Sequence, residues 1–312
     1  MRVLAGDPLD WNATSNAGSA VSIGVFDGVH RGHQEVLADL AVQADARGGL
    51  QRVVLTFDPH PLALLTPGHE PPLIGSLSQR LDWLAAEGVD LVGVLPFEQI
   101  RLMEAADFVE QILVKSLGTR VVVVGMDFRY GRGRDGTIET LIGAGSRLGF
   151  AVDAVPLLTE HDGALSSSNV RILVQQGEVE AAAEVLARPF AVRGEVVEGD
   201  RRGRGIGFPT ANLRFDAEVL IPKHGVYATL AEIDRQTYPS VTNVGVRPTF
   251  DGHIETVETH LLDVDLDLYG KTIDVHFISS IRPEQKFGDV EALVTQITAD
   301  VREARFKLTS PE

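Results

Sequence analysis

The spacing of apolar residues changes once along this chain, near residue 187, and that change limits the possible folds more than any other feature. Before it, short apolar runs such as Val53–Phe57 and Arg120–Gly125 alternate with segments in which apolar residues recur with a helical period, such as 36–44. Strands that alternate with helices indicate a parallel sheet. We therefore predict an α/β domain over residues 1–186.

Short strands dominate the rest of the chain. They are apolar runs broken by glycine, proline and charge, at 190–197, 225–233, 256–262 and 272–281. A single helix with an apolar stripe follows from Val290 to Ala304. This pattern predicts a second domain over residues 187–312, a small antiparallel β-barrel with a C-terminal helix.

The composition narrows the class of protein. The chain has 312 residues, 44% hydrophobic and 23% charged, which is ordinary for a globular protein of two domains. A formal net charge of -16 disfavours general binding to nucleic acid or to anionic membranes, because both depend on basic surfaces. The absence of cysteine excludes disulfides, thiolate metal sites and cysteine nucleophiles. With no signal peptide and no apolar run of membrane-spanning length, we expect a cytoplasmic protein, a monomer or weak homo-oligomer.

Two histidines, His30 and His33, follow an apolar run, Val21–Val25, at the point where a helical period begins. A helix N-terminus presents unpaired N–H groups and partial positive charge, so imidazoles in its first turn suit an anionic phosphate. Gly32 between them lets backbone approach a ligand closely. The alternative is a pair of surface histidines at a helix start. The strand before and the helix after favour a nucleotide phosphate site.

Arginine interleaved with glycine stands out against the acidic background. The arginines form two clusters, Arg129, Arg132 and Arg134, and Arg201, Arg202 and Arg204. Such loops suit contacts with phosphate, although solvated surface arginines are also common in them. The glycines at 131–136 match G-x-G-x-x-G, but they do not follow a strand directly, so we do not interpret them as a dinucleotide-binding fingerprint.

A second glycine-rich segment, 203–212, ends in a hydroxyl and an amide. A segment of this kind can wrap phosphates and hold Mg²⁺ without being a P-loop. The G-K-T at 270–272 lacks the first glycine of a Walker A motif and lies between predicted strands, so we exclude that interpretation.

Several stretches resemble signatures of one enzyme family. GVFDGVHRGH (24–33) resembles the signature of flavin-adenylyl transferases in the H-x-G-H nucleotidyltransferase superfamily, and GRGIGFPTANL (203–213) resembles that of riboflavin kinases. Further matches are TFDPHP at 56–61, VGMDFRYG at 124–131, SSSNVR at 166–171, NVGVRPTF at 243–250, VETHLLD at 257–263 and RPEQKF at 282–287. Their order resembles that of the bifunctional bacterial riboflavin kinase/FAD synthetase family.

For residues 1–186 the resemblance implies a Rossmann-like nucleotidyltransferase that joins FMN to the AMP moiety of ATP and releases pyrophosphate. His30, His33 and Arg171 are then expected to stabilise phosphate charge during the transfer. The other expected contacts are Asp27, Gly32, Asp127, Ser167 and Ser168 with ATP, and His60 and Pro61 with the flavin. An ordinary serine N-cap explains the serines equally well. Val25 stands where many relatives carry asparagine, so we assign it no polar role.

For residues 187–312 the resemblance implies a riboflavin kinase. Gly203, Gly205 and Gly207 would bind the ATP phosphates, while Thr210 and Asn212 would contact both Mg²⁺ and the phosphates. Glu258 would be the base that accepts the hydroxyl proton of riboflavin. Arg282 and Phe287 would belong to a flap over the flavin. Two alternatives apply to these residues taken singly. Glu258 can be a strand glutamate that faces solvent, and Arg282 and Phe287 can belong to a solvated loop. Glu255 is the neighbouring competitor for the role of base.

The sequence therefore predicts two ATP-dependent steps on one chain, from riboflavin to FMN and from FMN to FAD, with Mg²⁺ and ATP required. Two other functions stay open at this point. One is a flavin- or nucleotide-binding sensor that has lost catalysis, which the retention of Glu258, both histidines and Arg171 argues against. The other is an enzyme with only one of the two activities.

Overall fold

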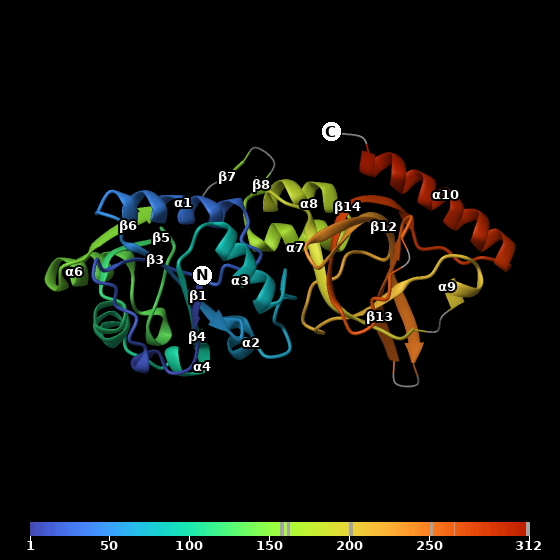
Figure 1. Ribbon diagram of the computed structural model, residues 1–312. Helices are drawn as coiled ribbons and strands as arrows, with labels where there is room; N and C mark the ends of the chain where they lie inside the picture. Colours follow the sequence, from blue (N-terminus) through green and yellow to red (C-terminus); the bar gives the residue numbers. More distant parts are fainter. Residues whose placement is uncertain (157–158, 161–162, 200–201, 250–251, 265, 310–312) are drawn as a thin grey trace. The chain divides into compact units, whose positions relative to one another are not determined.

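The structure is a computed structural model that describes residues 1–156, 159–160, 163–199, 202–249, 252–264 and 266–309 (Figure 1). These residues form two compact units. The first comprises Met1–Pro71 and Leu77–Leu165, and the second comprises Pro72–Ser76 and Ser166–Glu312. Each unit has its own principal sheet and its own hydrophobic core.

A six-stranded sheet forms the centre of the first unit, in the order β1-β4-β3-β2-β5-β6. Every strand pair in this sheet is parallel, which confirms the prediction from the alternating pattern. Its strands are β1 (Arg2–Leu4), β2 (Ser19–Ile23), β3 (Gln51–Asp58), β4 (Leu91–Pro96), β5 (Thr119–Gly125) and β6 (Ala151–Val155). A two-stranded ribbon of β7 (Thr159–Glu160) and β8 (Gly163–Ala164) follows β6.

Hydrophobic cores lie on both faces of this sheet, because successive residues of a strand point to opposite sides. Val53 of β3 packs in one core with Ile112, and Val54 packs in the other with Leu84. The helices of the unit are η1 (Pro8–Asp10), α1 (Arg31–Asp45), α2 (Pro61–Leu65), α3 (Leu77–Ala86), α4 (Phe97–Ile100), α5 (Ala105–Asp107), the π-helix η2 (Phe108–Ser116), η3 (Arg132–Arg134) and α6 (Ile138–Leu148). Helix α5 is continued directly by the π-helix η2.

A closed antiparallel barrel forms the centre of the second unit, in the order β10-β13-β12-β11-β14-β9. It confirms the predicted barrel, although β10 and β12 were not predicted as strands. The strands are β9 (Phe190–Val197), β10 (Ala211–Arg214), β11 (Gly225–Ile233), β12 (Gln236–Thr249), β13 (Gly252–Leu261) and β14 (Thr272–Pro283). The helices are α7 (Ser167–Gln176), α8 (Val179–Leu186), α9 (Arg202–Gly205) and the predicted C-terminal helix α10 (Val290–Thr309).

Helices α7 and α8 group with the barrel. The apolar side of α8 is buried, and α8 packs on β9 and β14 of the barrel. Glu180 of α8 accepts hydrogen bonds from Ser279 and from the Ser280 amide of β14. The compact units therefore divide before α7, whereas the boundary at residue 186 for two independently folding halves stays a prediction.

A row of hydroxyl side chains runs through the inside of the barrel. The Thr229 hydroxyl lies 2.8 Å from the hydroxyls of Ser240 and Thr242, and Thr242 lies 3.0 Å from Thr259. Ser240 also donates to the Thr229 carbonyl at 3.0 Å. All four side chains are fully buried, so the hydroxyls satisfy one another inside an otherwise apolar barrel.

Candidate active sites

The two histidines of the first unit lie at the start of α1, in the order that the sequence predicts. His30 is the N-cap residue of α1 and His33 lies in its first turn. Their rings stack with centroids 3.8 Å apart, and the ring of Phe26 lies 5.0 Å from that of His33. His30 is buried. The pair therefore has a packed position, which argues against two surface histidines at a helix start.

Gly32 allows this stacking because it has no side chain. A Cβ at this position would lie 3.0 Å from the Leu165 carbonyl oxygen and 3.2 Å from the ring of His30. Any larger residue would push against backbone on one side and imidazole on the other. The structure thus supplies a packing reason for Gly32, while its contact with ATP stays a prediction.

An aromatic cavity of about 420 Å³ opens in the same unit. Its wall includes Phe57, Phe97, Phe128 and Tyr130, with the rings of Phe128 and Tyr130 stacked 5.7 Å apart. Four arginines also line it, Arg101, Arg129, Arg132 and Arg134. A cavity with flat apolar walls and guanidinium groups suits a planar ring system that carries a phosphate.

The other predicted residues of the adenylyl-transfer site lie in several places. Asp127 is exposed just after β5. His60 caps α2, accepting a hydrogen bond from the Leu62 amide at 3.1 Å, and Pro61 is the first residue of that helix. Neither is among the residues that line the aromatic cavity, although Leu65 at the end of α2 is.

The predicted phosphate residues on α7 belong to the second unit. Ser166 is the N-cap residue, accepting from the Asn169 amide at 3.3 Å, so Ser167 and Ser168 lie inside the first turn. Arg171 is buried and its Nε donates to the Pro72 carbonyl at 2.7 Å. The histidines and Arg171 thus belong to different units, and their joint action stays a prediction.

Strand register brings the predicted kinase residues together on the barrel. Glu258 of β13 lies directly opposite Asn212 of β10 on one side and Asn243 of β12 on the other. Residues opposite one another across a ladder share a face of the sheet. Arg247 joins this group, since its Nη2 lies 3.5 Å from both Glu258 Oε1 and Asn212 Oδ1.

Two cavities meet at Asn212, which lines both. One, of about 630 Å³, is also lined by Gly203 and Thr210. The other, of about 840 Å³, is lined by Arg247 and by the loop that precedes β11. Gly205 and Gly207 of the glycine-rich segment are not among the residues that line either cavity.

The structure separates the two candidate bases. Glu255 is hydrogen-bonded to His224, with Oε2 at 2.8 Å from Nε2. Glu258 instead faces Asn212 and is near the Arg247 guanidinium. Glu258 lies opposite Asn212, which lines both cavities, whereas Glu255 itself lines the larger one, and the choice of Glu258 as base stays a prediction.

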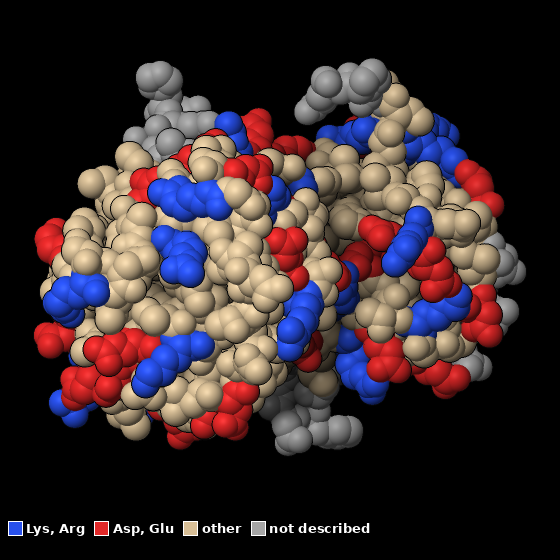
Figure 2. All heavy atoms as spheres, turned by 60° about the vertical axis from the view of Figure 1, so that its left-hand side comes forward, with Lys and Arg blue, Asp and Glu red and all other residues tan. Residues whose placement is uncertain are grey.

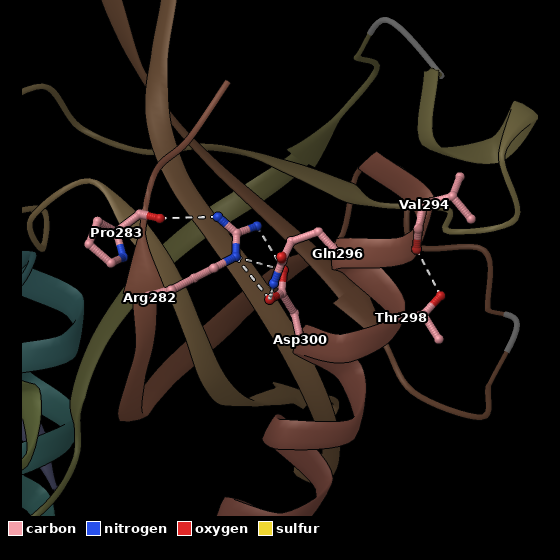
Figure 3. Close-up of polar contacts among 6 residues, drawn as sticks. All are labelled: Arg282, Pro283, Val294, Gln296, Thr298 and Asp300. Carbon is pink, nitrogen blue, oxygen red and sulfur yellow. Dashed lines mark hydrogen bonds and ion pairs between the residues drawn. The ribbon is translucent and has the colours of Figure 1, made fainter. Parts of the chain in front are cut away.

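The predicted flap arginine is engaged in a buried ion pair (Figure 3). Arg282 donates from Nε to Asp300 Oδ1 at 2.9 Å and from Nη2 to Asp300 Oδ2 at 2.7 Å. Gln296 donates to the same carboxylate, which is almost fully buried on α10. The guanidinium also lies 5.7 Å from the centroid of the Phe287 ring. Arg282 therefore ties the flap to α10, and its contact with flavin stays a prediction.

Parts of two predicted motifs cannot be placed. Arg201 and Phe250 lie outside the described residues, as do the side chains of Arg202 and Arg204.

On the face that Figure 2 shows, basic and acidic side chains are interspersed. Among the described residues, no helix is both long enough and apolar enough to cross a bilayer. The predicted lack of nucleic-acid binding stays untested.

Comparisons with known proteins identify the family of this chain. Family sequence models match at residues 12–169 for FAD synthetase and at residues 186–308 for riboflavin kinase. The bifunctional riboflavin kinase/FMN adenylyltransferase of Escherichia coli (strain K12) is 39% identical over 298 residues, which cover 94% of this chain and 95% of the relative. The chain belongs to this bifunctional family. It phosphorylates riboflavin to FMN and adenylylates FMN to FAD, with ATP as co-substrate.

Other relatives extend the comparison. The bifunctional riboflavin kinase/FMN adenylyltransferase of Bacillus subtilis (strain 168) is 36% identical over 294 residues, which cover 92% of each chain. A crystal structure from Streptococcus pneumoniae, described as a macrolide-efflux protein, has a TM-score of 0.88 at 32% identity and covers 98% of this chain and 99% of its own. Membership of the bifunctional family decides against the sensor and the single-activity enzyme.

Sequence reasoning missed two parts of the sites. Asn243 and Arg247 lie within the matched NVGVRPTF segment, so the motif contained them, but only the register of β12 and β13 shows that they reach Glu258. The aromatic cavity was missed because its rings come from four separate segments, which contain Phe57, Phe97, Phe108, and Phe128 with Tyr130. The sequence analysis noted only the arginines Arg129, Arg132 and Arg134 of its lining.

Proposed function

We propose that riboflavin phosphorylation occurs where the two barrel cavities meet. ATP would occupy the cavity lined by Gly203 and Thr210, and riboflavin the larger cavity lined by Arg247. The observation that carries this proposal is that Asn212 lines both cavities and lies opposite Glu258 in the register. A phosphoryl group that passes between substrates must cross such a shared position.

Glu258 would act as general base in this reaction. Its carboxylate would accept the proton of the ribityl 5′-hydroxyl while that oxygen bonds to the γ-phosphorus and ADP leaves. Arg247 Nη2 lies 3.5 Å from Glu258 Oε1, and its guanidinium would interact with the carboxylate and with the transferring phosphoryl group. Asn212 and Asn243 would fix the line of transfer from the two neighbouring strands.

Mg²⁺ would be held by Thr210 and Asn212 together with the ATP phosphates. The two side chains offer a hydroxyl and an amide oxygen to one cavity, and hard oxygen ligands suit this ion. The described residues contain no group of three or more His, Cys, Asp or Glu that could hold a metal alone. Mg²⁺ usually takes few protein ligands and completes its shell with water and phosphate, so this donor set fits. When bound, the ion would neutralise phosphate charge.

FMN adenylylation would use the histidine pair and the aromatic cavity. The FMN ring would lie among the aromatic side chains with its phosphate toward the arginines. A phosphate oxygen of FMN would attack the α-phosphorus of ATP, and pyrophosphate would leave. His30, His33 and Arg171 would stabilise the charge that develops on the phosphates. The positions of the two rings at the N-terminus of α1 support this role.

Kinetics of Glu258→Gln and Glu255→Gln test the kinase assignment. We expect Glu258→Gln to lower riboflavin phosphorylation by roughly 10²- to 10⁴-fold, the usual contribution of a general base. FAD formation from supplied FMN should persist in the same protein. Glu255 lines the larger cavity, so Glu255→Gln is the competing candidate and should lower phosphorylation much less than Glu258→Gln. Glu303→Gln, at an exposed glutamate of α10, is the control and should keep both activities. Equal losses in Glu258→Gln and Glu255→Gln would contradict the role of Glu258.

Location and assembly remain proposals of the same rank. We propose the cytoplasm, where ATP and riboflavin are both available, and a monomer or weak homo-oligomer. Sedimentation of the purified protein over a range of concentrations measures the second directly, and a stable oligomer at the lowest concentration would contradict it.

A further inference from the structure

Arg80 of α3 is one of the largest fully buried side chains in the molecule, at 1% exposed. Its Nη1 donates to the Phe57 carbonyl at 2.9 Å and to the Thr56 hydroxyl at 3.1 Å. Burial lowers the pKa of Arg80, and the nearby carboxylates of Asp27 and Asp58 act in the opposite direction. Among the described residues, its Nε is buried with no hydrogen-bond partner.

If stability were its only role, such a residue would be unfavourable. A buried charge must be compensated by partners, and a buried donor without one adds a desolvation penalty. Replacing buried ionic groups by apolar side chains of similar size is often neutral or stabilising. The role of Arg80 therefore lies in the groups that its guanidinium holds in place rather than in stability.

The contacts of Arg80 continue toward the histidines through Thr56. The Thr56 hydroxyl donates to the Val25 carbonyl at 2.8 Å. Arginine can only donate and a carbonyl can only accept, so the single proton of Thr56 must point to Val25 and its lone pair to Arg80. The donors of this hydrogen-bond chain therefore all point one way, from Arg80 on α3, through Thr56 near the end of β3, to Val25 in the loop between β2 and α1.

That loop adopts a conformation that its sequence does not favour. Phe26 has φ +53° and the β-branched Val29 has φ +38°, and both side chains are buried. Residues other than glycine persist in the left-handed region only where their surroundings hold them there. The ring of Phe26 packs against His33, so the loop conformation sets the place of that imidazole.

We propose that Arg80 and Thr56 are positioning residues for FMN adenylylation. Together they hold the Val25 carbonyl, and through it the loop that leads to Phe26 and His33. Neither residue needs to touch ATP or FMN for this role. The inference rests on the histidines acting in adenylyl transfer.

Thr56→Val and Thr56→Ser form the decisive pair. Valine keeps the shape of threonine without the hydroxyl, whereas serine keeps the hydroxyl. We expect Thr56→Val to lower kcat for FMN adenylylation about tenfold with little change in KM for ATP, since a misplaced catalytic group weakens transition-state rather than ground-state interactions. Thr56→Ser should stay within about twofold of the wild type, because the chain through the hydroxyl is intact.

Two controls keep a structural effect apart from positioning. Thr119→Val removes another buried hydroxyl of the same sheet, which donates to the Leu113 carbonyl, and should leave adenylylation unchanged. Riboflavin phosphorylation, measured on each variant, reports whether the protein is folded and active elsewhere. Arg80→Met should lower adenylylation in the same direction as Thr56→Val. If Arg80→Met does not fold, the Thr56 pair still decides.

Three outcomes would overturn the proposal. The first is Thr56→Val with normal kcat. The second is Thr119→Val with the same loss as Thr56→Val, which would indicate a general effect of buried hydroxyls. The third is a Thr56→Ser variant as impaired as Thr56→Val. If His33→Ala keeps full adenylylation, the assignment of the histidines fails instead, and that result is distinguishable because it does not involve Thr56.

Discussion

The two candidate catalytic regions of this chain place their side chains by different means. In the first unit, the histidines follow the carboxyl end of β2, in a short loop and the first turn of a helix. In the second unit, Asn212, Asn243 and Glu258 lie on three different strands and meet through the barrel register. The first site depends on the backbone conformation of one contiguous segment, and the second on the pairing of segments distant in sequence.

This difference predicts which changes harm which reaction. Adenylylation should be sensitive to residues that support the loop between β2 and α1. Phosphorylation should be sensitive to residues that pack against the strands of the barrel. Because one chain carries both reactions, each activity serves as the internal control for the other.

Replacing a histidine should give the largest effect on adenylylation. We expect His33→Ala to lower FMN adenylylation roughly 100- to 1,000-fold, the usual cost of losing one group that stabilises transition-state charge. The loss should appear in kcat more than in KM, while riboflavin phosphorylation is unchanged. Steady-state kinetics of both reactions measure this.

His69→Ala provides a matched control, since His69 is an exposed histidine of the same unit. It should keep both activities. Near-normal adenylylation in His30→Ala and His33→Ala alike would mean that the stacked pair is structural only, and the loop would then have no catalytic importance.

Gly199→Ala should give the next largest effect, this time on riboflavin phosphorylation. A Cβ at Gly199 would overlap the side-chain amide of Asn212, so that amide must move. Misplacement of a positioning group by about 1 Å costs up to about 100-fold in rate. We therefore expect a loss of up to that size in riboflavin phosphorylation, with adenylylation retained.

The control for this variant is Gly143→Ala, because a Cβ at Gly143 would have nothing within 4 Å. Normal phosphorylation in Gly199→Ala would show that the barrel site tolerates a displaced Asn212. The importance of strand packing for this site would then be overestimated.

Removing one wall of the aromatic cavity should have a smaller effect. Stacking of a planar ring on an aromatic side chain contributes ~1–3 kcal/mol, so we expect Phe128→Ala to raise KM for FMN about tenfold in adenylylation. Phosphorylation should not change. Phe306→Ala, at an exposed phenylalanine of α10, is the control. An unchanged KM for FMN would place the flavin elsewhere in the first unit.

Cutting the chain at two places should have the smallest effect on chemistry. A fragment of residues 187–312 lacks α8, whereas one of residues 166–312 keeps it on β9 and β14. Each buried valine or leucine of α8 contributes ~1.5–3 kcal/mol, so the shorter fragment should melt at a lower temperature. Both should phosphorylate riboflavin at comparable rates. Thermal unfolding by circular dichroism and an assay of each fragment provide the comparison, and equal melting temperatures would support the boundary at residue 186.

The fold was largely accessible from the sequence because the apolar patterns are local. The strand at 190–197 and the helix at 290–309 begin where the sequence indicates. The strands β10 and β12 were not, for physical reasons. β10 has only four residues, and β12 contains two prolines and a glycine, which weaken strand propensity. Their pairing with β13 supplies the stability that local sequence lacks.

The sites were accessible to the extent that a motif is contiguous. One segment contains His30 and His33, so a reader of the sequence finds both at once. Arg247 reaches Glu258 only because β12 pairs with β13. The hydrogen bond from Thr56 to the Val25 carbonyl depends on how β2 and β3 lie together and on the direction in which the Thr56 hydroxyl donates. Neither contact is marked by a pattern among neighbouring residues, so neither could be predicted from one sequence.

The buried hydroxyl row of the barrel has a consequence for each of its members. Four hydroxyl protons must serve four contacts, and Ser240 gives its own to the Thr229 carbonyl. Thr229 must then donate to Ser240, Thr242 to Thr229, and Thr259 to Thr242. Thr259 is fully buried, so its hydroxyl is satisfied within the row and is not presented to the cavity that Thr210 lines. Removing that hydroxyl, as in Thr259→Val, would leave the Thr242 oxygen without its donor, so each hydroxyl of the row depends on the next.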